Sequence, residues 1–150
     1  MTTIRRASDP DASALQAIYQ KCLVEAAWQQ RAVETIPGFA DVTHGETVWV
    51  AVDAMDHVLA VLAVQEGDAY IHHLYVDPRS QAQGLGRALL QHLQTYLAFP
   101  WRLKCVAQNH AALKFYQHLG WREIEQGQGE DGVYYLLEHT GQLQENNSTE

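Results

Sequence analysis

Apolar and polar residues alternate along the chain in two periods, one helical and one extended. Residues 8–10 (Ser-Asp-Pro) are typical of a helix start, because a short polar side chain caps the first turn and proline fits its first position. Apolar residues with helical spacing follow at Leu15, Ile18, Tyr19 and Cys22. A second, less regular helical stretch is expected over 25–32, before Pro37 and Gly38.

Extended segments dominate the next part of the chain. Residues 47–52 and 58–64 are rich in β-branched side chains and are separated by a short polar turn, which predicts a hairpin. A third strand of the same meander is expected over 69–76. From Gly84 the period becomes helical, because leucines recur at every fourth position from 85 to 97. The remaining pattern predicts a strand over 101–107, a helix over 109–119, a strand over 121–125, a turn through Gly127, Gly129 and Gly132, and a strand over 133–138.

The predicted order is α-α-β-β-β-α-β-α-β-β, with a β-α-β unit at its centre. This order indicates an α/β (α+β) fold in which helices pack on the faces of a mixed sheet. A length of 150 residues, with 47% hydrophobic and 19% charged residues, is typical of one globular domain. We expect that domain to span 1–141, followed by a disordered polar tail over 142–150.

The sequence excludes several protein classes. No apolar run approaches the ~20 residues of a membrane span, and the N-terminus lacks the apolar core of a signal peptide. We therefore expect a cytoplasmic protein with no membrane partner. The two cysteines, Cys22 and Cys105, have no metal-ligand spacing and form no disulfide framework. Reduced thiols are the expectation in that compartment.

Charge is divided unevenly along the chain. The net charge of −8 argues against a nucleic-acid partner. Residues 78–122 contain six basic and no acidic residues, so the rest of the chain carries 4 basic and 18 acidic residues, a net −14. Such a division suggests different partners for the two parts, although charged helix faces in solvent produce it as well.

The segment 74–87 carries the most informative chemistry. A strand is stopped by Pro78, and a loop with Gly84 and Gly86 opens directly into a helix. The free N–H groups of a helix start form a site for a phosphate or pyrophosphate. The loop is not a Walker loop, because Gly86 is followed by Arg-Ala rather than by Lys-Ser or Lys-Thr. It is not a dinucleotide fingerprint either, because Leu89 stands where the third glycine is needed.

The loop Gln81-x-x-Gly84-x-Gly86 resembles the acyl-CoA loop of the GNAT acetyltransferase superfamily, whose pattern is Arg/Gln-x-x-Gly-x-Gly/Ala. A second stretch begins 23 residues after Gly86 and reads Asn-x-x-Ala-x-x-Phe-Tyr-x-x-Leu-Gly-Trp over 109–121. It is similar to the other signature of that superfamily. Together the two stretches cover about a third of the chain, in the usual order and separation. Ala82 stands where many relatives have glycine, at a variable position of the motif.

The resemblance implies six or seven strands, about four helices, and acetyl-CoA in a cleft where two central parallel strands splay. The loop 81–87 would hold the pyrophosphate, and the pantetheine arm would pair with the backbone near Leu74 and Val76. Arg79, Arg87 and Lys114 are candidates for the CoA phosphates. No metal is implied. The implied cofactor-binding residues are Leu74, Tyr75, Val76, Gln81, Ala82, Gln83, Gly84, Leu85, Gly86, Arg87, Asn109, Ala112 and Tyr116.

Two residues of the second signature each allow an ordinary structural interpretation. Tyr116 is either a core aromatic residue with its hydroxyl at the surface or, as the resemblance implies, the general acid for the leaving thiolate. Asn109 is a favourable helix N-cap, and relatives use the matching residue to bind the CoA arm. The two roles of Asn109 are compatible.

The adjacent histidines His72 and His73 lie in a predicted strand, so we expect them on opposite faces and expect no two-histidine metal site. His72 matches a position where some relatives place a catalytic base, and Tyr70 would share its face. An ordinary strand histidine is the alternative. Other residues are expected to be ordinary packing residues (Tyr19, Glu25, Trp28) or surface histidines (His44, His57, His92, His110, His118, His139).

The sequence thus predicts an acetyl-CoA-dependent N-acetyltransferase acting on a primary amine by direct transfer, with Tyr116 and His72 as catalytic residues. The alternative is a non-catalytic acyl-CoA-binding regulatory domain, because fold does not guarantee function. The acidic excess outside 78–122 favours a cationic acceptor. A homodimer is left open.

Overall fold

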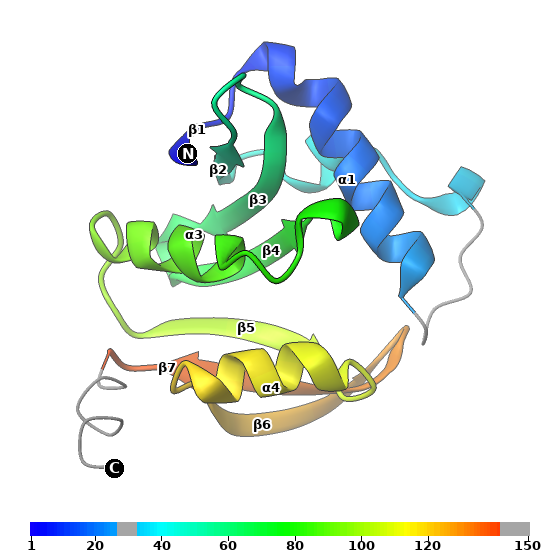
Figure 1. Cartoon of the computed structure of the whole chain (residues 1–150). Coiled ribbons are helices and arrows are strands. Elements are labelled where there is room, and N and C mark those ends of the chain that lie inside the picture. The colour runs from blue at the N-terminus through cyan, green and yellow to red at the C-terminus, as the bar shows by residue number, and fades with distance from the viewer. Residues whose placement is uncertain (27–32, 142–150) are drawn as a thin grey trace.

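The computed structural model describes residues 1–26 and 33–141. Its centre is one seven-stranded sheet with the order β1-β2-β3-β4-β5-β7-β6 (Figure 1). Strands β4 and β5 pair in parallel, and every other neighbouring pair is antiparallel. The strands are β1 (Thr3–Arg6), β2 (Thr47–Val52), β3 (Val58–Gln65), β4 (Tyr70–Val76), β5 (Trp101–Val106), β6 (Arg122–Gly129) and β7 (Gly132–His139).

Helices cover both faces of this sheet. The α-helices are α1 (Ala12–Glu25), α2 (Phe39–Val42), α3 (Leu85–Gln94) and α4 (His110–His118). Short 3-10 turns lie at Asp9–Asp11, Val33–Thr35, Glu66–Asp68 and Pro78–Ser80. The 3-10 turn Asp9–Asp11 leads directly into α1, and Ser8 and Asp11 form a reciprocal capping box at its start, so the helix start predicted at residues 8–10 is confirmed.

Alternate residues of the central strands point to opposite faces of the sheet and pack into two separate hydrophobic cores. Val50, Val61 and Ala63 pack under α1 and α2, while Ala51, Ala60 and Leu62 pack under α3. Figure 1 shows α3 and α4 on the same side of the sheet. Neither helix is long and apolar enough to cross a membrane, and the same holds for α1 and α2.

The mixed, helix-covered sheet predicted from the sequence is confirmed, and most predicted bounds lie within a residue or two of the observed ones. Three features differ. The edge strand β1 and the short helix α2 were not predicted, because four-residue elements have too little pattern to stand out. Strand β6 is longer than predicted, since Gly127 and Gly129 lie within it and the turn is confined to Glu130 and Asp131.

Part of the predicted second helix lies outside the described residues. Helix α1 ends at Glu25, and Ala26 has extended backbone angles. Residues 27–32, including Trp28, and the tail 142–150 are not described.

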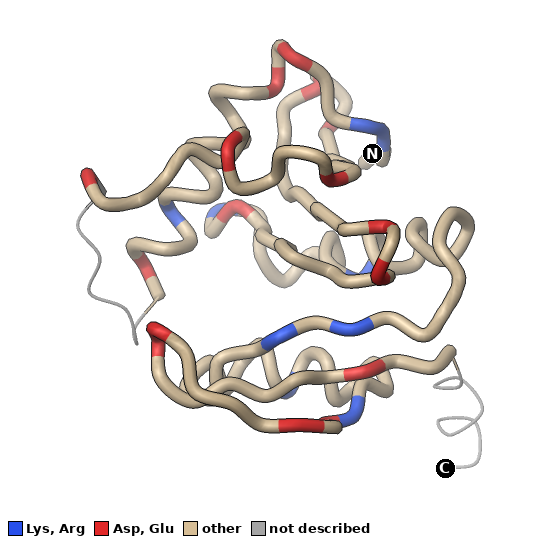
Figure 2. The backbone as a smooth tube through the Cα atoms, turned by 180° about the vertical axis from the view of Figure 1, so that it is seen from behind, with Lys and Arg blue, Asp and Glu red and all other residues tan. Residues whose placement is uncertain are grey.

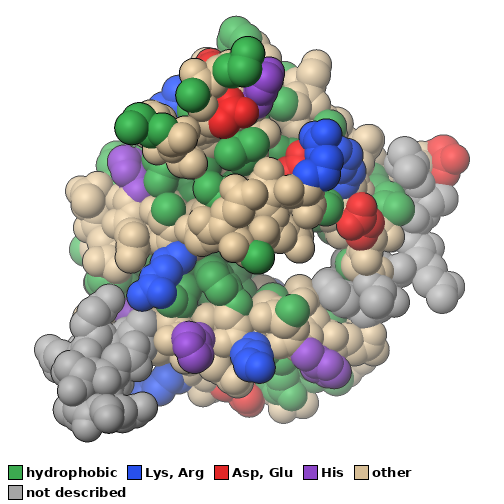
Figure 3. Space-filling model, viewed as in Figure 1, with side chains coloured by type: hydrophobic (Ala, Val, Ile, Leu, Met, Phe, Trp, Pro, Cys, Tyr) green, Lys and Arg blue, Asp and Glu red, His purple; other side chains and the backbone are tan. Residues whose placement is uncertain are grey.

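The parallel pair β4 and β5 separates along its length. The two strands are in register at Tyr70 and Arg102, near the start of each, and the described residues show no second register pair between them. The side of β4 that faces β5 is therefore an open edge from His72 to Val76. Figure 3 shows the surface hollowed between the loop that leads into α3 and helix α4. The splay expected of two central parallel strands is confirmed.

Candidate active site

The loop before α3 presents a helix start to this hollow. Gly84 is the N-cap of α3 and has φ of +76°, a left-handed conformation that favours glycine, and no side chain caps the helix there. Ala82 also has a positive φ, +66°, although an L-residue with a Cβ is strained in that region. The first N–H groups of α3 are thus available for an anion.

Gly86 has a packing role that the sequence did not reveal. It is buried in the first turn of α3, and a Cβ at this position would lie 3.3 Å from Cζ of Phe115 and 3.9 Å from Cδ2 of Leu74. The absence of a side chain lets α3 approach both α4 and β4. Gly86 therefore sets the position of the first turn of α3, with its free N–H groups, relative to the open edge of β4.

The end of β4 is connected to the same loop. The side-chain amide of Gln81 donates a hydrogen bond to the carbonyl oxygen of Val76, 3.4 Å away. Leu74 and Val76 pack toward the α3 face, whereas Tyr75 packs toward the α1 face. Arg79 lies beside Asp77, with Nη2 and Oδ2 3.1 Å apart. Of the three predicted phosphate ligands, Arg79 thus already has a carboxylate partner.

Helix α4 holds the residues of the second signature. Asn109 is its N-cap, and its Oδ1 accepts a hydrogen bond from the backbone N–H of Ala112 at 3.1 Å. The capping role predicted for Asn109 is confirmed. Tyr116 is 8% exposed and packs against the rings of Phe115 and Trp121. Burial, with smaller effects of Cys105 and Tyr75, raises the pKa of Tyr116 well above its ordinary value, so its hydroxyl stays protonated.

A β-bulge in β4 overturns the prediction that His72 and His73 lie on opposite faces. Ala63 of β3 pairs with His73, and the next residue, Val64, pairs with Ile71, so His72 is an extra residue in β4. Both histidines consequently lie on the α1 face of the sheet. Their ring centroids are 3.9 Å apart, with an interplanar angle of 35°.

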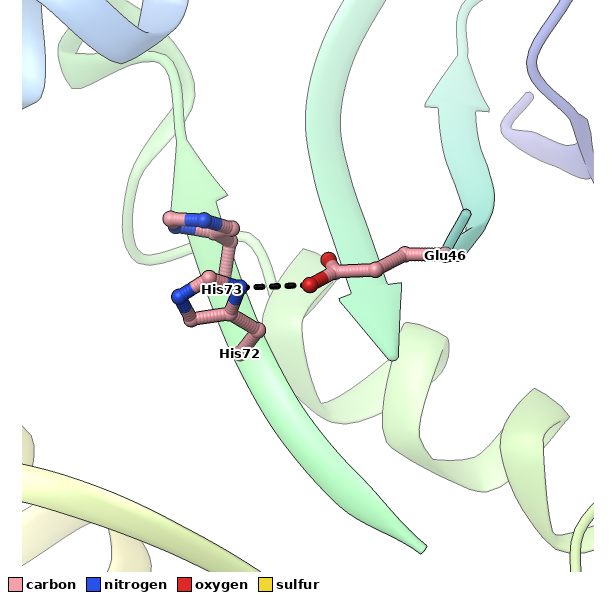
Figure 4. A group of neighbouring side chains, drawn as sticks. All are labelled: Glu46, His72 and His73. Atoms are coloured by element: carbon pink, nitrogen blue, oxygen red, sulfur yellow. Dashed lines mark hydrogen bonds and ion pairs between the residues drawn. The ribbon is translucent and has the colours of Figure 1, made fainter. Parts of the chain in front are cut away.

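Glu46, in the segment before β2, contacts this histidine pair. No pattern in the sequence pointed to it. Its Oε2 lies 2.6 Å from Nδ1 of His72 (Figure 4) and accepts a second hydrogen bond from the amide of Gln65 at 3.2 Å. The side chain of Glu46 is 4% exposed, whereas that of His72 is 36% exposed. No motif links residues 26 positions apart, so only the fold reveals this contact.

His73 is the inner member of the histidine pair. It is buried against the rings of Tyr19 and Phe39, and its Nδ1 lies 3.3 Å from the hydroxyl of Tyr75. Burial, followed by the nearby His72, lowers the pKa of His73 to about 3. His73 is therefore neutral at physiological pH. Tyr19 lies in the α1–α2 core, as expected of a packing residue.

Glu46, His72 and His73 each offer a metal-ligand atom, and these atoms lie within 4.8 Å of one another. The sequence predicted no such group, because alternation placed the two histidines on opposite faces and indicated no further ligand near them. Nδ1 of His72 is hydrogen-bonded to Glu46, and Nδ1 of His73 lies 3.3 Å from the hydroxyl of Tyr75. A metal ion bound at these nitrogens would have to displace both contacts.

His72 borders a cavity of about 830 Å³ on the sheet face opposite α3. Tyr70 lines the same cavity, as predicted from its spacing, and the β5 residues Arg102 and Lys104 line it together with Asp68. Figure 2 shows these two basic positions on β5. Arg102 is paired with Glu138 at 3.1 Å, and the Lys104 ammonium lies 4.8 Å from the centre of the Tyr134 ring.

One further histidine was placed wrongly by the sequence. His139 is 7% exposed, and its Nε2 lies 2.7 Å from the carbonyl oxygen of Leu119. It packs among Phe99, Trp101 and Trp121, so it is a core residue and not a surface one. Both cysteines are free thiols, as expected.

Comparison with known proteins connects this geometry to one family. The family model of the acetyltransferase (GNAT) domain matches residues 7–136. A curated relative, the [ribosomal protein bS18]-alanine N-acetyltransferase of Escherichia coli (strain K12), is 42% identical over 69 residues. That match covers 43% of this chain and 46% of the relative. The chain is thus aligned with less than half of that relative.

Solved structures match over almost the whole chain. YjaB from Escherichia coli has a TM-score of 0.75 at 22% identity and covers 94% of this chain and 99% of its own. The ribosomal-protein-S18-alanine N-acetyltransferase from Escherichia coli has a TM-score of 0.69 at 25% identity, with 92% of each chain covered. The putative acetyltransferase yncA from Salmonella typhimurium, solved with acetyl-CoA, has a TM-score of 0.69 at 21% identity and 93% coverage of both chains.

Proposed function

The chain belongs to the GNAT acetyltransferase family, and on that premise we propose that it transfers an acetyl group from acetyl-CoA to a primary amine of a small molecule or peptide. The observation that carries the proposal is the uncapped start of α3 beside the open edge of β4. The helix start suits a pyrophosphate, and an open strand edge suits the amide groups of pantetheine.

The acetyl-CoA site is proposed to follow the loop and the two strands around the hollow. The backbone from Gln81 to Arg87 would bind the pyrophosphate, and Leu74, Tyr75 and Val76 would pair with the pantetheine arm. The side-chain amide of Asn109 and the backbone at Ala112 would contact the same arm from α4. The sulfur would then lie near Tyr116. A neighbour solved with acetyl-CoA supports the choice of cofactor.

The proposed reaction begins with the acceptor as an ammonium ion, because an alkyl amine has a pKa near ~10.4. His72 takes one proton from it, directly or through one water, and passes that proton to solvent. The neutral nitrogen attacks the thioester carbon, the C–N bond forms, and the C–S bond breaks. The thiolate takes the hydroxyl proton of Tyr116, and the second proton lost from nitrogen restores Tyr116 through solvent. The backbone N–H near Val76 would stabilise the oxyanion.

The acceptor is proposed to be cationic as it approaches the enzyme. The support is the net charge of −14 outside residues 78–122, since negative potential raises the local concentration of cations.

The proposal is tested by calorimetry with acetyl-CoA, followed by an assay of free-thiol release in the presence of a panel of amines. We expect binding, and thiol release that depends on one class of amine. No binding at millimolar acetyl-CoA would overturn the proposal. Binding without thiol release for any amine would instead identify a non-catalytic acyl-CoA-binding domain.

A further inference from the structure

The contact between Glu46 and His72 has the geometry of a carboxylate that orients a base. A carboxylate only accepts hydrogen bonds, so the 2.6 Å contact requires the proton of neutral His72 to be on Nδ1. The other ring nitrogen, Nε2, then carries the lone pair. Because His72 is the partly exposed member of the group and borders the cavity, its lone pair is accessible to an amine there.

The surroundings of Glu46 make its negative charge energetically important. The carboxylate is almost fully buried, and its second oxygen, Oε1, has no hydrogen-bond partner among the described residues. A buried carboxylate with incomplete hydrogen bonding is costly. The hydrogen bond from His72 supplies one of the few partners of this buried carboxylate, and a positive charge that forms on the ring during proton transfer would lie directly beside it.

Among the described residues around His72, no other group could act as its carboxylate partner. His73 stacks on His72 and Tyr70 lies beside it, with ring centroids 3.9 Å and 6.2 Å from that of His72. Arg102 and Lys104 are the cations that line the cavity, and Asp68 is the acid. Glu46 is the one carboxylate hydrogen-bonded to His72 in the described part of the chain.

We propose that Glu46 is a positioning residue that fixes the tautomer of His72 and stabilises its imidazolium during acetyl transfer. This inference rests on the proposed function, because it assigns the supporting partner of the proposed base. The role is that of the buried aspartate in a serine-protease triad, which orients a histidine through Nδ1 and stabilises its charged form. Here the histidine would deprotonate an amine rather than a hydroxyl group.

The tautomer is measured first, on the free protein, by long-range proton–nitrogen NMR of the His72 ring. We expect the proton on Nδ1 in the wild-type protein. In Glu46→Gln the exclusive preference for Nδ1 should be lost, because an amide both donates and accepts hydrogen bonds. The matched control is Asp53→Asn, which changes a similar but exposed pair, His57 and Asp53, at 3.2 Å. It should leave the signals of His72 unchanged.

Kinetics with acetyl-CoA and an active amine form the second part of the test. Glu46→Gln should lower kcat by about 10-fold or more, less than the 10²–10⁴-fold that a complete acid–base group contributes, and leave the KM for acetyl-CoA unchanged. Glu46→Asp, which keeps the charge, should recover part of the rate, and Asp53→Asn should match the wild-type enzyme.

Three results would overturn the inference: a wild-type His72 protonated on Nε2, a Glu46→Gln variant with wild-type kcat, or a Glu46→Asp variant that recovers none of the lost rate. Thermal melting of each variant separates these outcomes from misfolding. Failure of the proposed function can be distinguished from failure of this inference, because the tautomer of His72 can still be measured in a wild-type protein that shows no activity.

Discussion

Tyr116 has a packing role in the structure in addition to the acid role proposed for it. Its ring lies in the core between Phe115 and Trp121, so the position of its hydroxyl is fixed by neighbours on α4 and at the start of β6. Burial raises its pKa, and the hydroxyl therefore carries its proton at every pH at which the enzyme would work. The hydroxyl is thus held in place with its proton available to a leaving thiolate, while the raised pKa makes it a weaker acid than a free tyrosine.

Replacing Tyr116 by phenylalanine separates these two contributions. The ring and its packing remain, so the melting temperature should change little. Loss of the donated proton should lower kcat by about 10²–10⁴-fold, the usual contribution of a positioned acid, with the affinity for acetyl-CoA retained. Steady-state kinetics and calorimetry on the same preparation test this. Wild-type turnover in Tyr116→Phe would remove Tyr116 from the mechanism.

At the scale of elements, the packing of α3 depends on the missing side chain at Gly86. We expect Gly86→Ala to change the stability of the fold by about 1 kcal/mol or less, because the new Cβ at 3.3 Å from Phe115 makes the ring or the helix shift by a few tenths of an ångström, while alanine favours the helix by a similar amount. The same shift moves the anion-binding turn and should weaken binding of acetyl-CoA. Gly67→Ala is the control, since a Cβ there meets nothing within 4 Å.

Denaturant unfolding and calorimetry compare the two glycine variants. Equal stability and equal acetyl-CoA affinity in Gly86→Ala and Gly67→Ala would show that the close approach of α3 to α4 is unimportant. A loss of stability or of acetyl-CoA affinity that is confined to Gly86→Ala would support the role of Gly86 in positioning the loop.

Elements with strong local patterns could be predicted from the sequence, and long-range contacts could not. The hairpin of β2 and β3, the leucine repeat of α3 and the loop at Gly84 depend on neighbouring residues, so the sequence shows them directly. The bulge at His72 depends on how β4 pairs with β3, and alternation alone placed the two histidines on opposite faces. Glu46 reaches His72 only because the sheet brings β2, β3 and β4 together, so no local signal could have identified it.

At the scale of the whole molecule, the net charge of the chain differs from the charges that line the cavity. The acidic excess is spread over the segments outside 78–122, and Figure 2 shows acidic positions on several loops. The cavity beside His72 does not repeat this excess, because Arg102 and Lys104 line it together with Asp68. Any attraction of a cationic acceptor would therefore act at long range, during approach, rather than through contacts inside the cavity.

Long-range attraction has a clear dependence on salt. The Debye length falls from ~10 Å at 0.1 M to ~3 Å at 1 M ionic strength, so charges distant from the cavity are screened first. For a cationic amine we expect kcat/KM to fall between these two concentrations while kcat stays nearly constant, because steering affects encounter and not chemistry. An acceptor screen at both salt concentrations measures this, with a neutral amine of similar size as control. If the best acceptor were anionic, or if kcat/KM for the cationic amine did not respond to salt, the acidic surface would serve solubility rather than substrate capture.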